Sequence, residues 1–129
     1  MTLQVELVVP DGEVWSGSAQ MVIAKTLEGD IGVLTGHAPV LGILAEGSVV
    51  RIRPDEDGAA EISAAVSSGF FSIADDRVSV LARQARLSSD IDPAAVQAAL
   101  DAELGDSGPE ESAQARYYRA QLVAAGAGS

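Results

Sequence analysis

The feature that most constrains this chain is a change of hydrophobic period near residue 87. Before it, apolar and polar residues alternate in short runs, starting with Leu3 to Val9, and turn residues separate the runs. A period of two is typical of half-buried strands, and many short strands indicate a sandwich or a barrel. After Leu87, alanine dominates, as expected of helices. We therefore predict a β domain over residues 1–86 and a helical segment over residues 87–129.

Turn residues predict two hairpins within the β domain. The run 48–53 leads into the polar loop 54–58, and a second run follows at 61–67. The pair Asp75-Asp76 separates two further runs of alternating residues. Clusters of Asp, Gly and Pro between such runs are typical of hairpin loops.

The helical segment carries start and stop signals for two helices. Asp92 suits an N-cap, and Pro93 suits the first position of a helix. Gly105 suits the end of that helix, and Pro109 starts a second one that runs to about Ala125. Isolated helices of this length are marginal in water, so we expect the helical hairpin to be loosely attached.

Composition excludes several classes of function. Nineteen acidic residues against eight basic ones give a formal charge of −11, which repels nucleic acid and anionic lipid. The absence of cysteine and the single histidine leave no metal-binding cluster with the spacing of a zinc site. No apolar stretch approaches the roughly 18 residues that cross a bilayer, so we expect no direct insertion into a membrane.

No motif supports catalysis. The serines lack the spacing of a nucleophile elbow, and the only lysine, Lys25, does not follow a glycine-rich phosphate loop. The adjacent carboxylates Asp75 and Asp76 leave a small acid–base enzyme open as an alternative, although a turn accounts for them more simply. We therefore assign no catalytic, cofactor-binding or metal-binding residue.

The most informative segment runs from Gly29 to Leu41. It places glycines and Pro39 among apolar residues, which indicates two tight bends. A histidine without partners for a metal or catalytic site is more often structural, so we expect His37 to bond a local carbonyl oxygen.

This segment, Gly-Asp-Ile-Gly-Val-Leu-Thr-Gly-His-Ala-Pro, resembles the signature of the epsilon subunit of F-type ATP synthases, the bacterial rotor-stalk protein. The resemblance continues in order through 14–17, 47–52, 65–71 and the helix start at Ile91-Asp92. It implies an α+β fold, in which an N-terminal ten-stranded antiparallel β-sandwich, or flattened barrel, precedes a C-terminal antiparallel hairpin of two helices.

The resemblance also implies a function and contact residues. A protein of this family is a non-catalytic subunit that couples rotation of the membrane ring to ATP synthesis, bound peripherally at the cytoplasmic face of the cell membrane. The implied contacts fall in two groups: Gly29, Asp30 and Ile31 for the c-ring, and His37, Ala38 and Pro39 for the gamma subunit.

The family's hairpin regulates ATP hydrolysis by extending into the catalytic alpha/beta head. The resemblance assigns Asp92, Arg116 and Arg119 to that regulatory hairpin. In some relatives an arginine of the first helix takes part in binding ATP, but this chain has Ala95 at the matching position. We therefore expect no nucleotide cofactor.

One further alternative remains open from the sequence. A free-standing β-sandwich that binds other proteins, with the helical hairpin as a dimerisation tail, would produce the same patterning. That protein would purify alone, whereas a stalk subunit would purify with the rest of an ATP synthase.

Overall fold

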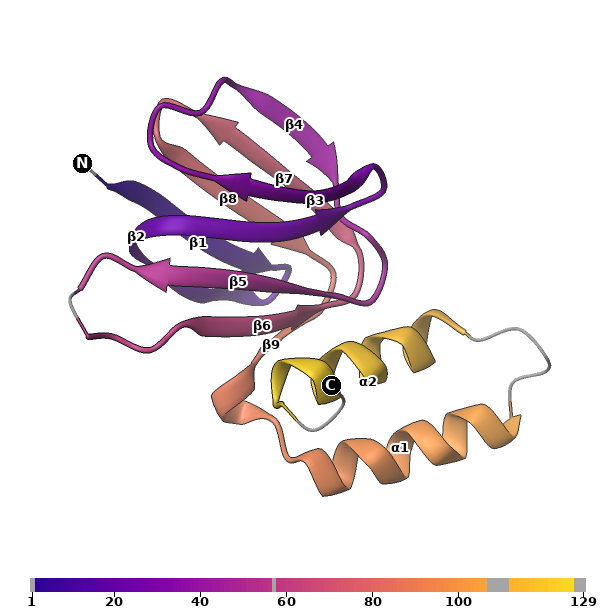
Figure 1. The fold of residues 1–129 in the computed structure, drawn as a ribbon. Coiled ribbons are helices and arrows are strands. Elements are labelled where there is room, and N and C mark those ends of the chain that lie inside the picture. The colour runs from indigo at the N-terminus through magenta and orange to yellow at the C-terminus, as the bar shows by residue number, and fades with distance from the viewer. Residues whose placement is uncertain (1, 57, 107–111, 127–129) are drawn as a thin grey trace.

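The computed structural model describes residues 2–56, 58–106 and 112–126, and it places a β-sandwich beside a pair of helices (Figure 1). The strands of the described residues are, in chain order, β1 Leu3–Val9, β2 Gly12–Thr26, β3 Gly29–Val33, β4 Val40–Ile43, β5 Ser48–Pro54, β6 Ile62–Val66, β7 Gly69–Ala74, β8 Arg77–Ala82 and β9 Ala85–Leu87. A short 3-10 helix, η1 Ser88–Asp90, then leads to α1 Pro93–Asp106 and α2 Ala113–Ala124.

Strand β2 is long because it belongs to both layers of the sandwich. Its first half pairs with β1, and its second half pairs with β3 and β5. The hydrogen-bonded path β4-β7-β8-β1-β2-β5-β6-β9 therefore passes from one layer to the other at β2, with β3 alongside (Figure 1). The described residues form nine strands where the resemblance implied ten, and the two roles of β2 account for the difference.

Pairing between the described strands is antiparallel, with the exception of β1 and β8, which run parallel. Parallel neighbours need a long connection between them, and strands β2 to β7 provide it. The α+β class and the sandwich architecture are confirmed, whereas the expectation of purely antiparallel pairing was wrong at this one position.

Both predicted hairpins are confirmed. Strand β5 pairs with β6, and β7 pairs with β8. Between β7 and β8, Asp75 and Asp76 adopt positive φ angles of 52° and 62°. Two consecutive left-handed residues are the signature of a type I′ turn, whose twist matches that of the strands. The carboxylate of Asp76 also accepts the backbone N–H of Gly36 at 2.7 Å, so this pair serves the turns.

The main core lies between the two layers and consists mostly of aliphatic side chains. Along β1, Leu3, Val5 and Leu7 are buried while the residues between them face solvent. Phe71 is the aromatic residue among the buried members of this core. Strand β9 ends at Leu87, so the sandwich includes one residue beyond the predicted limit of 86.

The first helix begins as predicted. The carboxylate of Asp92 accepts the N–H groups of Ala94 at 3.1 Å and Ala95 at 3.5 Å, which caps α1. The helix continues through Gly105 to Asp106 instead of ending at the glycine. The expected start of the second helix at Pro109 lies outside the described residues, within which α2 begins at Ala113 after the N-cap Ser112.

The hairpin has its own small core and a separate contact with the sandwich. Leu122 of α2 packs on Val96 and Leu100 of α1. On the other side of α2, Tyr117 and Ala120 pack against Ala65 of β6. Val49 of β5 and Ala124 of α2 also pack in this second cluster, which holds the hairpin on the sandwich.

Candidate functional site

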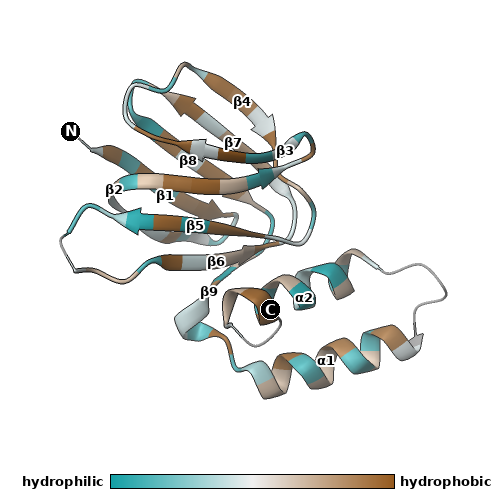
Figure 2. Cartoon of the chain, viewed as in Figure 1, coloured by the Kyte–Doolittle hydropathy of each residue, from teal (hydrophilic) through white to brown (hydrophobic). Residues whose placement is uncertain are grey.

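Three large apolar side chains lie exposed on the outer side of the sandwich. Leu41 and Ile43 of β4 are 73% and 58% exposed, and Phe70 of β7 is 48% exposed. Ile43 lies opposite Phe70 in the β4–β7 ladder, so both side chains are on the same face. The pair of strands lies away from the helices, and Figure 2 shows the hydrophobic residues on β4. We call this group the β4–β7 surface and treat it as a candidate interaction site.

A surface hollow of about 430 Å³ connects the β4–β7 surface to the turn between β2 and β3. Residues 26–31 line one side of it, and residues 40–43 line the other. The Thr26 hydroxyl donates to the carbonyl oxygen of Gly29 at 2.8 Å, which holds the turn. The predicted ring contacts Gly29, Asp30 and Ile31 therefore lie beside exposed apolar side chains.

The predicted gamma contacts lie in the loop between β3 and β4. His37 is half-buried, with its Nδ1 atom 2.8 Å from the carbonyl oxygen of Ala38. This is the local carbonyl bond that the sequence predicted for a structural histidine. Ala38 and Pro39 are exposed and lead directly into β4. The loop is therefore continuous in the chain with the β4–β7 surface.

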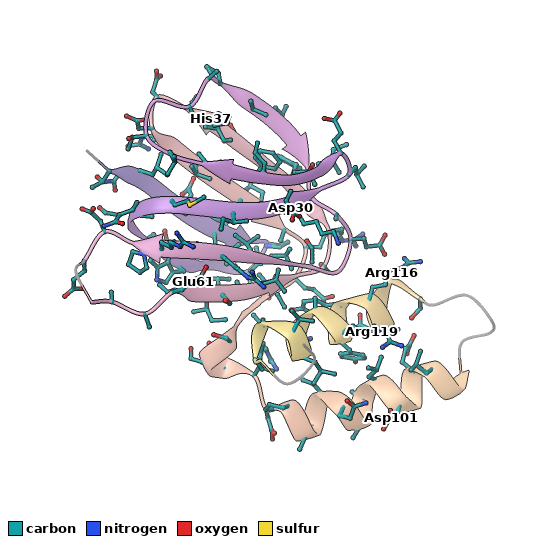
Figure 3. All side chains as sticks on the ribbon, viewed as in Figure 1. Asp30, His37, Glu61, Asp101, Arg116 and Arg119 are labelled. Carbon is teal, nitrogen blue, oxygen red and sulfur yellow. The ribbon has the colours of Figure 1, made fainter. Side chains whose placement is uncertain are left out.

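The two groups of predicted contacts lie apart. Asp30 is at the start of β3, and His37 follows the end of that strand, with at least about 10 Å of strand between them. Figure 3 shows His37 far from the helices and Asp30 on the side nearer to them. The two groups of predicted contacts therefore lie at different ends of β3.

The residues assigned to the hairpin occupy distinct positions. Arg116 forms an ion pair with Glu46 at 3.3 Å, and both side chains are nearly half exposed, so the pair contributes at most about 1 kcal/mol. Arg119 lines a cleft of about 320 Å³ between α2 and the sandwich, together with Lys25 and Arg51. Asp92, in contrast, is the N-cap of α1 and serves the helix itself.

Tyr117 is the largest side chain in the contact between hairpin and sandwich, with 6% of its surface exposed. Burial raises the pKa of its phenol above the ordinary value, and the nearby positive charge of Arg86 offsets part of that rise. The docked hairpin therefore favours the neutral phenol.

The Tyr117 phenol should make docking of the hairpin weaken as pH rises above about 10, the ordinary tyrosine pKa. The reason is that the docked state binds the phenol proton more tightly than the undocked state does. The radius of gyration from small-angle X-ray scattering would follow this change. Tyr117→Phe should remove the pH dependence while Tyr118→Phe keeps it; equal titration of both variants would contradict the assignment.

Within the described ranges, no group of three or more His, Asp or Glu side chains is placed to hold a metal ion. Ala95 lies exposed on α1, where it lines a cleft of about 450 Å³ that Arg83 and Arg86 also border. The Ala95 methyl group offers no charge to a nucleotide phosphate. The expectation that no nucleotide binds stays a prediction.

A sequence profile of the family described as ATP synthase, Delta/Epsilon chain, beta-sandwich domain matches residues 2–88. The chain belongs to this ATP synthase delta/epsilon family. Curated relatives named ATP synthase epsilon chain agree with it. The relative from Thermobifida fusca is 46% identical over 92% of this chain and 87% of its own length, and the one from Rhodococcus opacus is 51% identical over 81% and 83%. The resemblance seen in the signature segment is thus confirmed.

Solved ATP synthases extend the similarity to the whole fold of this delta/epsilon family member. A chain of the mitochondrial ATP synthase of Euglena gracilis superposes with a TM-score of 0.70 at 21% identity, over 94% of this chain and 75% of its own. A chain of the Tetrahymena thermophila central stalk and c-ring gives 0.62 at 17% identity, over 98% and 97%. Both matches extend past the profile into the helical segment.

Sequence reasoning missed the residues that make up the β4–β7 surface and those that hold the hairpin against the sandwich. The run Val40 to Ile43 is apolar on both faces of a strand, although only one face can pack on the core of the sandwich, and this was the available signal. For Tyr117 the signal was weaker, because either of two adjacent tyrosines fits a helical stripe.

Proposed function

We propose that this chain works as the epsilon subunit in the central stalk of an F-type ATP synthase. The observation that carries the proposal is the identity of 46–51% with relatives named ATP synthase epsilon chain, over most of the chain in several cases. The subunit is non-catalytic, and its role is to transmit rotation between the membrane ring and the catalytic head. A β-sandwich whose strands are joined by cross-strand pairs resists the shear that such a role imposes.

The gamma subunit is the partner proposed for the β4–β7 surface and the adjoining loop from His37 to Pro39. Leu41, Ile43 and Phe70 would supply the apolar centre of that interface, and the loop would supply its polar rim. Loop contacts alone would be too small for a stable interface, so the exposed apolar face is the main support for this partner.

The c-ring is the partner proposed for the turn at Gly29, Asp30 and Ile31. Asp30 is exposed at a turn fixed by the Thr26 hydroxyl. A carboxylate held on such a turn suits a basic or hydrogen-donating group on a loop of the ring. The shared hollow with β4 means that the ring and gamma would meet neighbouring parts of one surface.

The hairpin is proposed to be a regulatory element that leaves the sandwich and extends into the catalytic alpha/beta head. It attaches to the sandwich through Tyr117, Ala120 and Ala65, and its own core is separate. Extension would release Arg116 from Glu46 and free Arg119 from the cleft, so that both side chains could meet acidic groups of the head.

In the described part of the chain, no helix is long and apolar enough to cross a bilayer. We propose that the protein is held at the cytoplasmic face of the cell membrane through the ring, as a peripheral part of the complex.

Purification of the tagged chain from its native membranes tests the proposal. We expect the gamma subunit and the c-ring to copurify, and we expect deletion of the chain to abolish coupled ATP synthesis. The alternative of a free-standing binding module predicts a protein that purifies alone and a deletion that leaves ATP synthesis intact. That outcome would overturn the stalk assignment.

A further inference from the structure

The turn between β4 and β5 touches the backbone of α2 at Gly47. This glycine has a φ of +64°, and a Cβ atom added to it would lie 2.6 Å from the carbonyl carbon and the Cβ of Arg116. It would also lie 2.7 Å from the Arg116 carbonyl oxygen. Two of these atoms are backbone, so a rotamer change cannot relieve the collision.

The turn itself cannot move aside easily. The Ala45 N–H donates to the carbonyl oxygen of Lys25 at 2.8 Å, and the Gly47 N–H donates to that of Ser67 at 2.6 Å. The buried hydroxyl of Ser48 donates to the Ala45 carbonyl oxygen at 2.8 Å, which closes the turn on itself. Any side chain at position 47 must therefore displace the helix.

The helix is the movable partner, because it belongs to the separate core of the hairpin, whereas the turn is bonded into the strands of the sandwich. Small side chains dominate the apolar cluster around Ala65, Tyr117 and Ala120, and Arg116 pairs with Glu46 in solvent. A close-packed contact between two rigid bodies is weakened over much of its area when one point is pushed away by about the length of a bond.

We propose that Gly47 is the seat on which the hairpin docks, and that its lack of a side chain sets the balance between the docked and the undocked hairpin. The turn Ala45 to Gly47 is thus a built-in control point for the hairpin. The link to ATP hydrolysis rests on the proposed function, whereas the docking itself belongs to the isolated protein.

Amide hydrogen exchange of the full-length chain tests the seat. In Gly47→Ala, amides of α2 from Tyr117 to Leu122 should exchange about tenfold faster than in the unchanged protein, relative to amides of β1. Gly58→Ala is the matched control, because Gly58 also has a positive φ, +78°, and a Cβ there would have no atom within 4 Å. Glu46→Gln should change the ratio less than about threefold, since the ion pair is exposed.

The proposal is overturned if the exchange rate of α2 amides relative to β1 amides is no higher in Gly47→Ala than in Gly58→Ala. It is also overturned if the β1 amides of Gly47→Ala exchange faster by the same factor, because that would mean general destabilisation. In the assembled ATP synthase, the Gly47→Ala chain should alter the rate of ATP hydrolysis. If α2 exchanges faster while hydrolysis is unchanged, the seat stands and the regulatory part of the proposed function fails.

Discussion

Changing Ile43 to Asp should weaken binding of the chain to the gamma subunit by at least about 2 kcal/mol, or roughly 30-fold. Ile43 lies at the middle of the β4–β7 surface, opposite Phe70 and two residues from Leu41. Docking of a partner would bury the new carboxylate among apolar groups without a counter-charge. The dissociation constant for purified gamma, measured by titration calorimetry, checks the prediction.

The fold should survive this substitution, because Ile43 is 58% exposed and its side chain faces away from the core. Leu104→Asp on α1 is the matched control. Leu104 has the same number of carbon atoms as Ile43 and is 38% exposed, but it lies off the β4–β7 surface. Ile43→Leu should retain most of the affinity. If Ile43→Asp and Leu104→Asp bind gamma equally well, the β4–β7 surface is not the gamma interface.

Local chemistry decided which parts of the fold were predictable. The turn at Asp75-Asp76 and the helix start at Asp92 depend on side chains acting on their own neighbouring backbone, so the sequence pattern was sufficient for both. The signature segment likewise located the turn at Asp30 and the loop at His37. These features need no knowledge of what packs across the molecule.

Contacts between distant segments decided the rest. The exposure of Leu41 and Ile43 follows from β4 pairing with β7 at the edge of a layer, which no local pattern reveals. The seat at Gly47 depends on the arrival of α2 against the β4–β5 turn. The sequence placed Gly47 only at the start of the segment 47–52 that resembles the family, because the atoms that restrict it belong to Arg116.

The same distinction explains why the hairpin was described only in part. Tyr118, Leu122 and Ala125 have the spacing of an apolar stripe on one helix face, and all three pack in the core shared with α1. Helix α2 also has a second partner, the sandwich, which buries Tyr117 and Ala120 on another side. An apolar stripe on one face could not predict that α2 packs against α1 on one side and against the sandwich on another.

A chain that ends at Leu87 should fold, bind the stalk and support coupled ATP synthesis, while ATP hydrolysis by the complex rises by at least about fivefold. All the strands of the described residues end by Leu87, and the core of the hairpin is separate from that of the sandwich. Removing the hairpin uncovers Ala65 and Val49, a small apolar area, so the free energy of unfolding should fall only modestly.

A relative gives independent support for this truncation. The ATP synthase epsilon chain of Frankia casuarinae is 50% identical over 88 residues, which are its entire length and 68% of this chain. About a third of this chain therefore has no counterpart there, and the matched length is close to the span 2–88 of the family profile. On this ground we expect the sandwich to be sufficient for coupling and the hairpin to be an addition to it. Thermal unfolding of the truncated chain and paired synthesis and hydrolysis assays separate the outcomes. Failure to fold would place the domain boundary elsewhere, and an unchanged rate of hydrolysis would remove the regulatory role while leaving the coupling role in place.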